Sequence, residues 1–218
     1  MKADEVARYL QDNPQFFEDH AELISRLVIP HPHGGRTISI TERQMLSLRE
    51  KNRQLEGKMG ELLQFGEEND AISEKMHRLC VALVASASFQ SVLHTLNFHL
   101  RDDFAIPHVA LRLWSCPSGH EEMPEFAEVS SELQSFAETL TQPYCGSTSG
   151  FETSSWFGDE ASRHMRSQAL IALRRGGGTI GMLAIGSEDA QRFYAGMGTL
   201  YLERLGELAS AALARVLR

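Results

Sequence analysis

The chain of 218 residues contains three features that could take part in chemistry. Three consecutive glycines at residues 176–178 could hold a phosphate, nine histidines could bind a metal ion, and Cys145 could serve as a nucleophile. Each of these uses requires a particular structural setting. The neighbouring sequence shows whether that setting is present.

A glycine loop that binds phosphate is followed by a helix, whose first amide groups point at the anion. Here the glycines are followed by TIGMLAIGS, residues 179–187, which has the composition of a strand. No Lys-Ser or Lys-Thr pair accompanies them. The glycines are therefore predicted to form the turn of a hairpin between two apolar strands.

The histidines and Cys145 match no recognisable metal or catalytic motif. His94 and His99 are five residues apart on a predicted helix, which rotates their side chains away from each other, and no HExxH motif occurs. The sequence indicates neither a helix N-terminus nor a cation beside Cys145, and it contains no GxSxG motif. We therefore expect no metal site, no catalytic residue and no enzymatic activity.

Composition argues against nucleic acid and membrane partners. The net charge is −8, and no basic run is longer than Arg174 and Arg175. No stretch approaches the roughly 18 apolar residues of a spanning helix, and the first residues do not resemble a signal peptide. The three cysteines are widely spaced, which is typical of a reducing compartment. A cytoplasmic protein is expected.

The first part of the chain is predicted to be helical. Residues 3–29 carry apolar side chains at helical spacing and form a small arm, which IPHPHGG at residues 29–35 stops or turns into a rigid elbow. A long helix is predicted from Glu42 to about residue 102, and a continuous helix of that length would measure about 90 Å.

The long helix contains a stripe with the 3-4 spacing of a coiled coil. The predicted seam comprises Met45, Leu48, Asn52, Leu55, Met59 and Leu62. A buried amide at Asn52 would pair with its twin and select a parallel register. The spacing changes phase near Gly66 and resumes at Ile72, Met76, Leu79 and Leu83. A parallel homodimer is expected, and the alternative is that the helix packs on its own domain.

The remainder of the chain mixes strands and helices. We predict strands at residues 108–114, 125–129, 169–174 and 179–187, with helices at 131–141, 159–165 and the C-terminal end. Residues 143–158, PYCGSTSGFETSSWFG, are predicted to be a long loop, and long loops in compact domains are usually functional or mobile.

Segments of the chain resemble two known families. The closing sequence SQALIALRRGGGTIGMLAIGSEDAQRFYAGMGTLYLERLGELASAAL resembles the end of a GAF domain, a PAS-related sensor fold. Nearly the whole chain resembles the bacterial family called domain of unknown function 484, through IPHP…SITERQ, YCG and AIGS…RF…GMGT. The resemblance implies an α+β fold, with a GAF-like antiparallel sheet flanked by helices behind a long coiled-coil helix and a small helical arm. It implies no established activity.

The GAF-like resemblance also implies a place for a ligand, between the sheet and the segments that cover one face. Aromatic rings with one guanidinium and hydroxyl groups suit a planar or anionic small molecule. In the other interpretation these side chains fill the core and bind nothing. The implied ligand-binding set comprises Arg112, Tyr144, Cys145, Phe151, Trp156, Phe157 and Ser167.

We therefore expect a helical arm at residues 1–39, a coiled-coil helix at 40–70 and a GAF-like domain at 71–218. The expected function is a non-catalytic sensor or interaction module that dimerises through its helices, with a possible small-molecule ligand and no identified cofactor. The alternative is a structural dimeric adaptor with a filled core. An unknown protein partner is expected to dock on residues 1–40.

Overall fold

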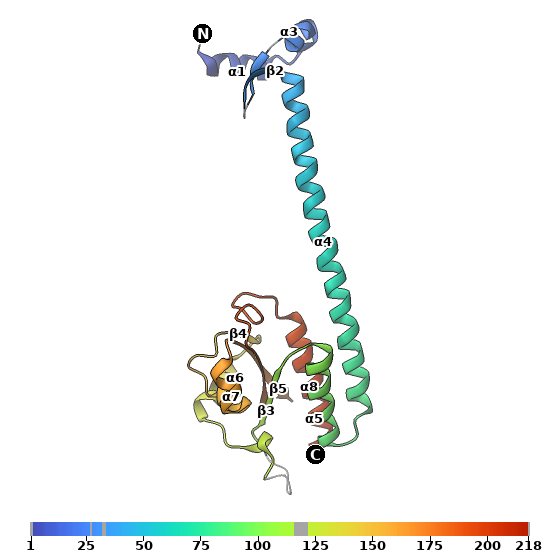
Figure 1. Ribbon diagram of the computed structural model, residues 1–218, viewed down its shortest axis with the longest axis vertical. Coiled ribbons are helices and arrows are strands. Elements are labelled where there is room, and N and C mark those ends of the chain that lie inside the picture. Colours follow the sequence, from blue (N-terminus) through green and yellow to red (C-terminus); the bar gives the residue numbers. More distant parts are fainter. Residues whose placement is uncertain (1, 27, 32–33, 116–121, 218) are drawn as a thin grey trace. The chain divides into compact units, whose positions relative to one another are not determined.

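The computed structural model describes residues 2–26, 28–31, 34–115 and 122–217 (Figure 1). The chain divides into two compact units, Met1–Glu68 and Asn69–Arg218. We call them the N-terminal unit and the C-terminal domain and describe each by itself. The helix α4, Ile40–Ala85, contributes residues to both.

The N-terminal unit begins with the predicted helical arm. Its three short helices are α1 (Ala3–Asp12), α2 (Gln15–Asp19) and α3 (Ala21–Arg26). The elbow predicted at residues 29–35 is wrong, because this region forms an antiparallel hairpin of β1 (Val28–His31) and β2 (Gly34–Ser39). Its β-branched residues favour a strand, and Pro30 is tolerated because both strands of a two-stranded hairpin are edge strands. Residues 32 and 33 lie outside the described residues.

The predicted long helix exists but ends earlier than expected. α4 stops at Ala85, and α5 (Phe89–Phe98) begins after a break at residues 86–88. The hydroxyl of Ser88 accepts a hydrogen bond from the amide of Ser91 (3.2 Å), and the Ser91 hydroxyl accepts one from the amide of Ser88 (3.0 Å). This capping box starts a new helix, so the apolar pattern continues through a change of direction. A π-helical turn, η1 (His99–Asp103), follows α5.

The C-terminal domain is built on a four-stranded antiparallel sheet with the order β3-β6-β5-β4. Its strands are β3 (His108–Leu113), β4 (Tyr144–Gly146), β5 (Ser167–Arg175) and β6 (Gly178–Ser187). Gly176 and Gly177 have φ angles of 58° and 89°, so the glycine turn between β5 and β6 is confirmed as a hairpin.

Two predictions for this domain are wrong. The expected loop at residues 143–158 contains the edge strand β4 and the 3₁₀ helix η3 (Glu152–Phe157). The strand expected at residues 125–129 is absent from the described structure, which has the 3₁₀ helix η2 (Pro124–Phe126) there. Pro124 favours this, because it fixes φ and lacks the amide donor that a strand ladder needs.

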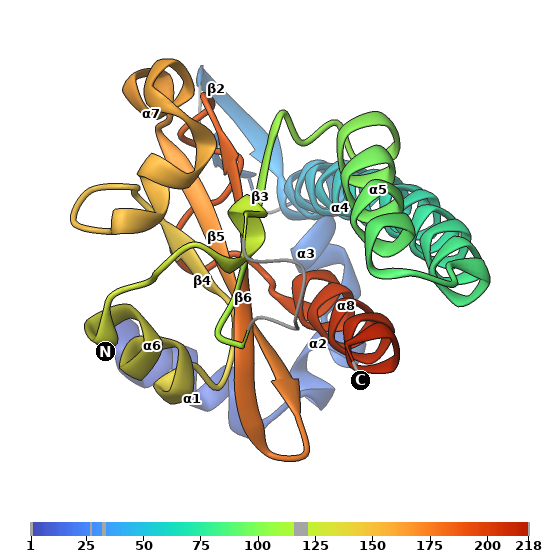
Figure 2. The same cartoon turned by 90° about the horizontal axis from the view of Figure 1, so that it is seen from below.

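Helices cover both faces of the sheet, as Figure 2 shows. The last turns of α4, α5 and α8 (Leu200–Val216) pack on one face, which we call the helical face. α6 (Ser131–Thr139), η3 and α7 (Asp159–His164) lie over the other, which we call the aromatic face. Alternation along β5 directs Ile171 to the helical face and Leu170 to the aromatic face. The predicted α+β class with a flanked antiparallel sheet is confirmed.

Candidate functional site

The structure brings five of the seven predicted ligand-binding residues together on the aromatic face. The rings of Tyr144 and Phe151 lie 4.9 Å apart between centroids, and Phe136 of α6 contacts both of them. The guanidinium of Arg112 lies 5.0 Å from the ring of Trp156. The five residues on this face are Arg112, Tyr144, Phe151, Trp156 and Phe157.

The other two predicted residues, Cys145 and Ser167, lie on the helical face. Cys145 is opposite Ala169 in the β4–β5 pair and packs with the helical-face core. Burial raises the pKa of its thiol to about 11, so the thiol stays protonated at neutral pH. The Ser167 hydroxyl donates to the carbonyl of Asp189 (2.6 Å) at the start of the link to α8. Because residues 144–146 form a strand, neighbouring side chains there point to opposite faces.

Arg112 stands beside a small polar cavity. The cavity has a volume of about 150 Å³ and lies at the edge strand β3, between α5 and η2. Its polar lining residues are Arg112, Asn97 and Glu125, and the rest of the lining is Trp156 and apolar residues of α5, β3, β6 and η2. Desolvation lowers the pKa of the Arg112 guanidinium, and the nearby charge of Glu125 opposes this shift. Within the described residues, the Oε2 atom of Glu125 is buried without a hydrogen-bond partner. Buried polar atoms are usually paired, so this oxygen is free to accept a hydrogen bond.

A buried polar pair holds η3 against the sheet. The hydroxyl of Thr153 donates to the Oε1 atom of Gln168 at 2.8 Å, and both residues are fully buried. This bond fixes the segment that carries Trp156 and Phe157. Sequence reasoning missed both residues, although one glutamine in the apolar strand SQALIALR was a visible signal that a polar partner lies opposite it.

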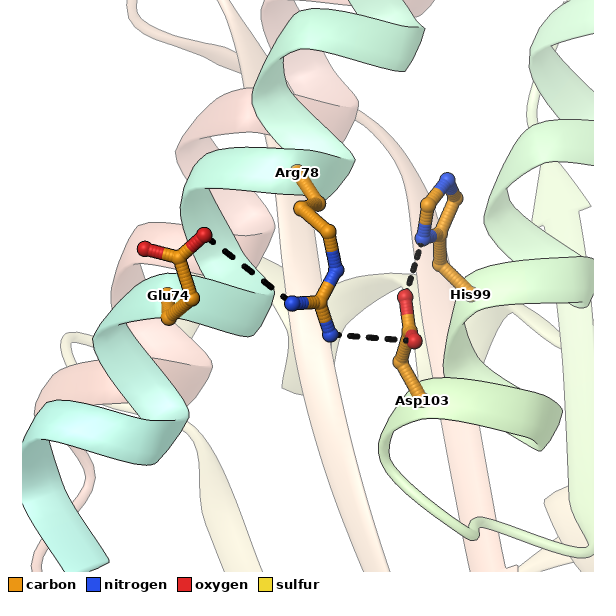
Figure 3. A network of polar contacts seen from close by, with 4 residues as sticks. All are labelled: Glu74, Arg78, His99 and Asp103. Carbon is orange, nitrogen blue, oxygen red and sulfur yellow. Dashed lines mark hydrogen bonds and ion pairs between the residues drawn. The ribbon is translucent and has the colours of Figure 1, made fainter.

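A second polar network joins α4 to the π-helical turn (Figure 3). Arg78 of α4 donates to Asp103 of η1 at 3.2 Å and lies 4.0 Å from Glu74. The Nδ1 atom of His99 lies 2.5 Å from the other carboxylate oxygen of Asp103. The hydrogen bond with His99, helped by Arg78, holds the pKa of Asp103 below its usual range against the effect of burial. The sequence did not predict this network, because it treated residues 42–102 as one helix.

α8 is fastened to α4 at two places within the C-terminal domain. The Tyr201 hydroxyl contacts the carbonyl of Asn69 (3.0 Å) and the hydroxyl of Ser73 (2.9 Å). Near the other end of α8, the Arg215 guanidinium donates to the carbonyls of Leu83 (2.8 Å), Val84 (3.0 Å) and Ser86. Leu83 and Val84 belong to the last turn of α4, whose carbonyls have no amide partner within the helix, so Arg215 helps to satisfy the end of α4.

The predicted seam residues on α4 are exposed in the single chain. The apolar members are 51–68% exposed, and Asn52 is exposed as well. The exposed apolar members are Met45, Leu48, Leu55, Met59 and Leu62. We call this set, together with Asn52, the α4 stripe. An apolar row of this length on one helix face is typical of a surface that packs on another helix.

Two classes of site find no support among the described residues. No group of three or more His, Cys, Asp or Glu side chains is arranged to hold a metal ion there. No helix in the described part of the chain is long and apolar enough to cross a membrane.

The sheet, its helical face and its loop-rich aromatic face define an α+β domain. The chain belongs to the DUF484 family of proteins of unknown function, which matches residues 1–217. It is similar to the uncharacterized protein YigA of Salmonella typhimurium strain LT2 (25% identity) and of Shigella flexneri (26%). Each of these alignments covers 96% of this chain and 90% of the relative.

The chain is also similar, at low identity, to parts of solved structures. The chain is similar to the A. aeolicus nlh2 GAF domain, at 13% identity and a TM-score of 0.49, over 67% of this chain and 97% of that one. It is similar to the free methionine-R-sulfoxide reductase of Neisseria meningitidis, at 15% identity and a TM-score of 0.48, over 66% and 89%. The GAF domain of the Escherichia coli potassium sensor KdpD gives 13% identity and a TM-score of 0.41, over 66% and 94%.

Proposed function

We propose that this protein is a non-catalytic interaction module in which two copies pair in parallel through the α4 stripe. The observation that carries the proposal is the exposure of five large apolar side chains at 3-4 spacing on one helix. Leaving such side chains in water forgoes about 1.5–3 kcal/mol for each one that could be fully buried. A second copy supplies a matching row, because the same spacing is present on both helices.

Asn52 sets the register of the proposed pair. It lies between Leu48 and Leu55 in the α4 stripe, at a position where the other members are apolar. In a parallel and in-register pair, the two Asn52 amides meet and hydrogen-bond to each other, whereas a shifted or antiparallel pair would bury each amide against leucine. The polar position therefore favours one arrangement at some cost in stability.

Sedimentation equilibrium of the full-length protein tests the pairing. Leu55→Asp places a charge in the centre of the α4 stripe and is expected to convert a dimer into a monomer. Leu46→Asp is the matched control, because Leu46 is also an exposed leucine of α4 but lies outside the stripe. If wild type is monomeric at tens of micromolar, or if both variants dimerise as wild type does, the proposal fails.

The cavity beside Arg112 supports a second candidate function, the binding of a small molecule at the edge of the sheet formed by β3. Arg112 over Trp156 and the unpaired Glu125 oxygen could contact a small polar ligand or one with a planar part. At about 150 Å³ the cavity is below the usual 300–1,000 Å³ of ligand pockets, so a larger ligand would have to displace Trp156.

A thermal-shift screen with nucleotides and small metabolites tests this second function. A ligand at one hundred times its Kd should add about 2.7 kcal/mol to the free energy of unfolding. Arg112→Met should abolish that shift, whereas Arg163→Met, an exposed arginine of α7, should preserve it. A screen in which no compound shifts wild type favours the alternative of an adaptor whose aromatic face is filled by its own rings.

The helical arm is proposed as the docking piece for a protein partner. α1 buries none of its residues, and Tyr9 and Phe17 are partly exposed beside the ring of Phe16. Exposed aromatic side chains are common anchors in protein interfaces. Proteins that co-purify with wild type but not with Tyr9→Ala/Phe17→Ala would be specific partners, and identical co-purifying sets would argue against this role.

A further inference from the structure

A groove of about 440 Å³ lies on the C-terminal domain beside β5 and α8. α8 forms one wall, residues 140–143 form the other, and Ile171 and Ala172 lie between them. The groove lies along the edge of β5, between α8 on the helical face and the segment after α6 on the aromatic face. Its volume is within the range of sites that accept an organic group.

Two local features create the space. β4 pairs only with residues 168–170, so the rest of β5 has no described strand on that side. α8 presents small residues to the groove, namely Gly206, Ser210 and Ala214, which are four residues apart and therefore share one helix face. A Cβ atom at Gly206 would lie 2.6 Å from the Cγ2 atom of Ile171, so the close approach of α8 to β5 requires this glycine.

The groove carries two carboxylates that lack a cation. Glu203 and Glu207 lie one helical turn apart on α8, and neither forms an ion pair with any residue that the structure describes. Like charges at this spacing repel each other. Glu203 is half-buried and accepts a hydrogen bond from the Thr199 hydroxyl at 2.6 Å, which holds its carboxylate in place.

The one guanidinium in the lining is already occupied. Arg174 donates to the carbonyls of Ala137 (3.3 Å), Glu138 (3.4 Å) and Leu140 (2.5 Å) at the end of α6. The carbonyl end of a helix carries partial negative charge and offsets that cation. The two glutamates therefore dominate the charge at their end of the groove, while Leu140, Pro143 and Ile171 provide apolar surface.

We propose that this groove binds a lysine or arginine side chain of a partner polypeptide. The cationic head lies between Glu203 and Glu207, and its methylene stem packs on Ile171 and Pro143, as long basic side chains do on apolar surface. A polypeptide suits the site because the groove is open to solvent, and neighbouring residues of the partner would cover it. This surface is distinct from the α4 stripe, so its test does not depend on pairing of two copies.

Fluorescence anisotropy with a labelled nine-residue peptide of alternating lysine and leucine tests the proposal on the full-length protein. Glu203→Gln/Glu207→Gln is expected to weaken binding about tenfold, since two partly exposed ion pairs are lost. Glu128→Gln/Glu160→Gln is the matched control, because it removes the same net charge from exposed positions outside the groove and should leave binding unchanged.

The variant Ala211→Leu provides an independent test that changes no charge. Ala211 is exposed and lines the groove, so a leucine there fills the space without disturbing the core, and peptide binding should fall. If both double glutamate variants lose peptide binding equally, the peptide is attracted to net charge only, and the proposal is overturned. Unchanged binding by Ala211→Leu would also overturn it. Competition by free spermidine as strong as that by the unlabelled peptide, at equal amine concentration, would assign the groove to small amines instead.

Discussion

Both halves of α4 carry a row of apolar side chains. The row in the first half is exposed, and the row in the second half is buried. In the first half, the apolar residues of the α4 stripe are more than half exposed. In the second half, Met76, Leu79 and Leu83 are at most 8% exposed in the core of the C-terminal domain. The phase of the apolar spacing changes between the halves, near Gly66. One helix therefore directs one apolar row into its own domain and leaves the other for a different partner.

The difference shows why the apolar spacing of a helix alone does not identify what covers it. The sequence left two alternatives for this helix: it pairs with a second copy, or it packs on the chain's own domain. The structure assigns packing on the domain to residues 76–83. Pairing through residues 45–62 remains our proposal, supported by the absence of any cover for that row among the described residues.

The largest effect that separates the two halves is expected from truncating one leucine in each. Leu79→Ala should lower the free energy of unfolding of the C-terminal domain by about 2–5 kcal/mol, because Leu79 is fully buried. Leu48→Ala should leave it nearly unchanged and instead weaken self-association. Urea unfolding followed by tryptophan fluorescence reports on this domain, since both Trp114 and Trp156 lie in it. Equal losses in the two variants would remove the distinction between the halves.

A smaller effect is expected at the polar position of the α4 stripe. Asn52→Leu should stabilise the paired first half by about 1–3 kcal/mol, because it removes a buried amide, and should permit other oligomers. Helix melting by circular dichroism and sedimentation equilibrium measure the two changes. Glu50→Leu, at an exposed position outside the stripe, serves as the control. A destabilised Asn52→Leu protein would mean that Asn52 does not face a helical seam.

The attachment of the second half to α8 gives the next prediction. Tyr201→Phe removes the hydroxyl that contacts Asn69 and Ser73, and should cost about 0.5–1.5 kcal/mol in the free energy of unfolding. Hydrogen exchange should accelerate at the start of the second half. Tyr194→Phe is the control, because Tyr194 is exposed and lies outside both helices. No difference between the two variants would show that this contact does not anchor α4.

The smallest effect is expected from the network of Figure 3. Asp103→Asn should cost at most about 1 kcal/mol at pH 7, as for other partly exposed ion pairs. The folded-state pKa of Asp103 is lowered, so its contribution is present above the unfolded-state pKa near 3.9 and disappears as the pH falls through the folded value. The difference between wild type and variant should therefore shrink as the pH falls below the unfolded-state pKa, and vanish where Asp103 is protonated in the folded protein as well. A difference that persists there would exclude the carboxylate as its source.

Much of the fold was predictable because local rules and tertiary packing agree in β3, β5, β6 and α8. Each strand alternates or is uniformly apolar, and the glycine turn can form only where positive φ is allowed. The break at residues 86–88 was missed because its capping serines are also acceptable within a helix, and the apolar spacing does not show a change of direction.

The candidate site was predictable in part. The resemblance to GAF domains implied that aromatic side chains lie near Arg112. β4, however, has only three residues and is held by pairing with β5. Such short strands depend on their neighbours for stability, so the sequence around Cys145 resembles a loop. Treating it as a loop concealed the alternation that sends Cys145 and Tyr144 to opposite faces. Contacts between distant segments, such as Thr153 with Gln168, have no local signature.

Amide hydrogen exchange along α4 tests the central claim most directly, because it reads both halves of the helix in one experiment. An isolated helix is only marginally stable in water, so protection of residues 45–62 requires a partner. Our account predicts that wild type protects both halves at micromolar concentration, whereas Leu55→Asp loses protection at 45–62 and keeps it at 76–83. Rapid exchange at 45–62 in wild type, or equal protection there in Leu55→Asp, would contradict it.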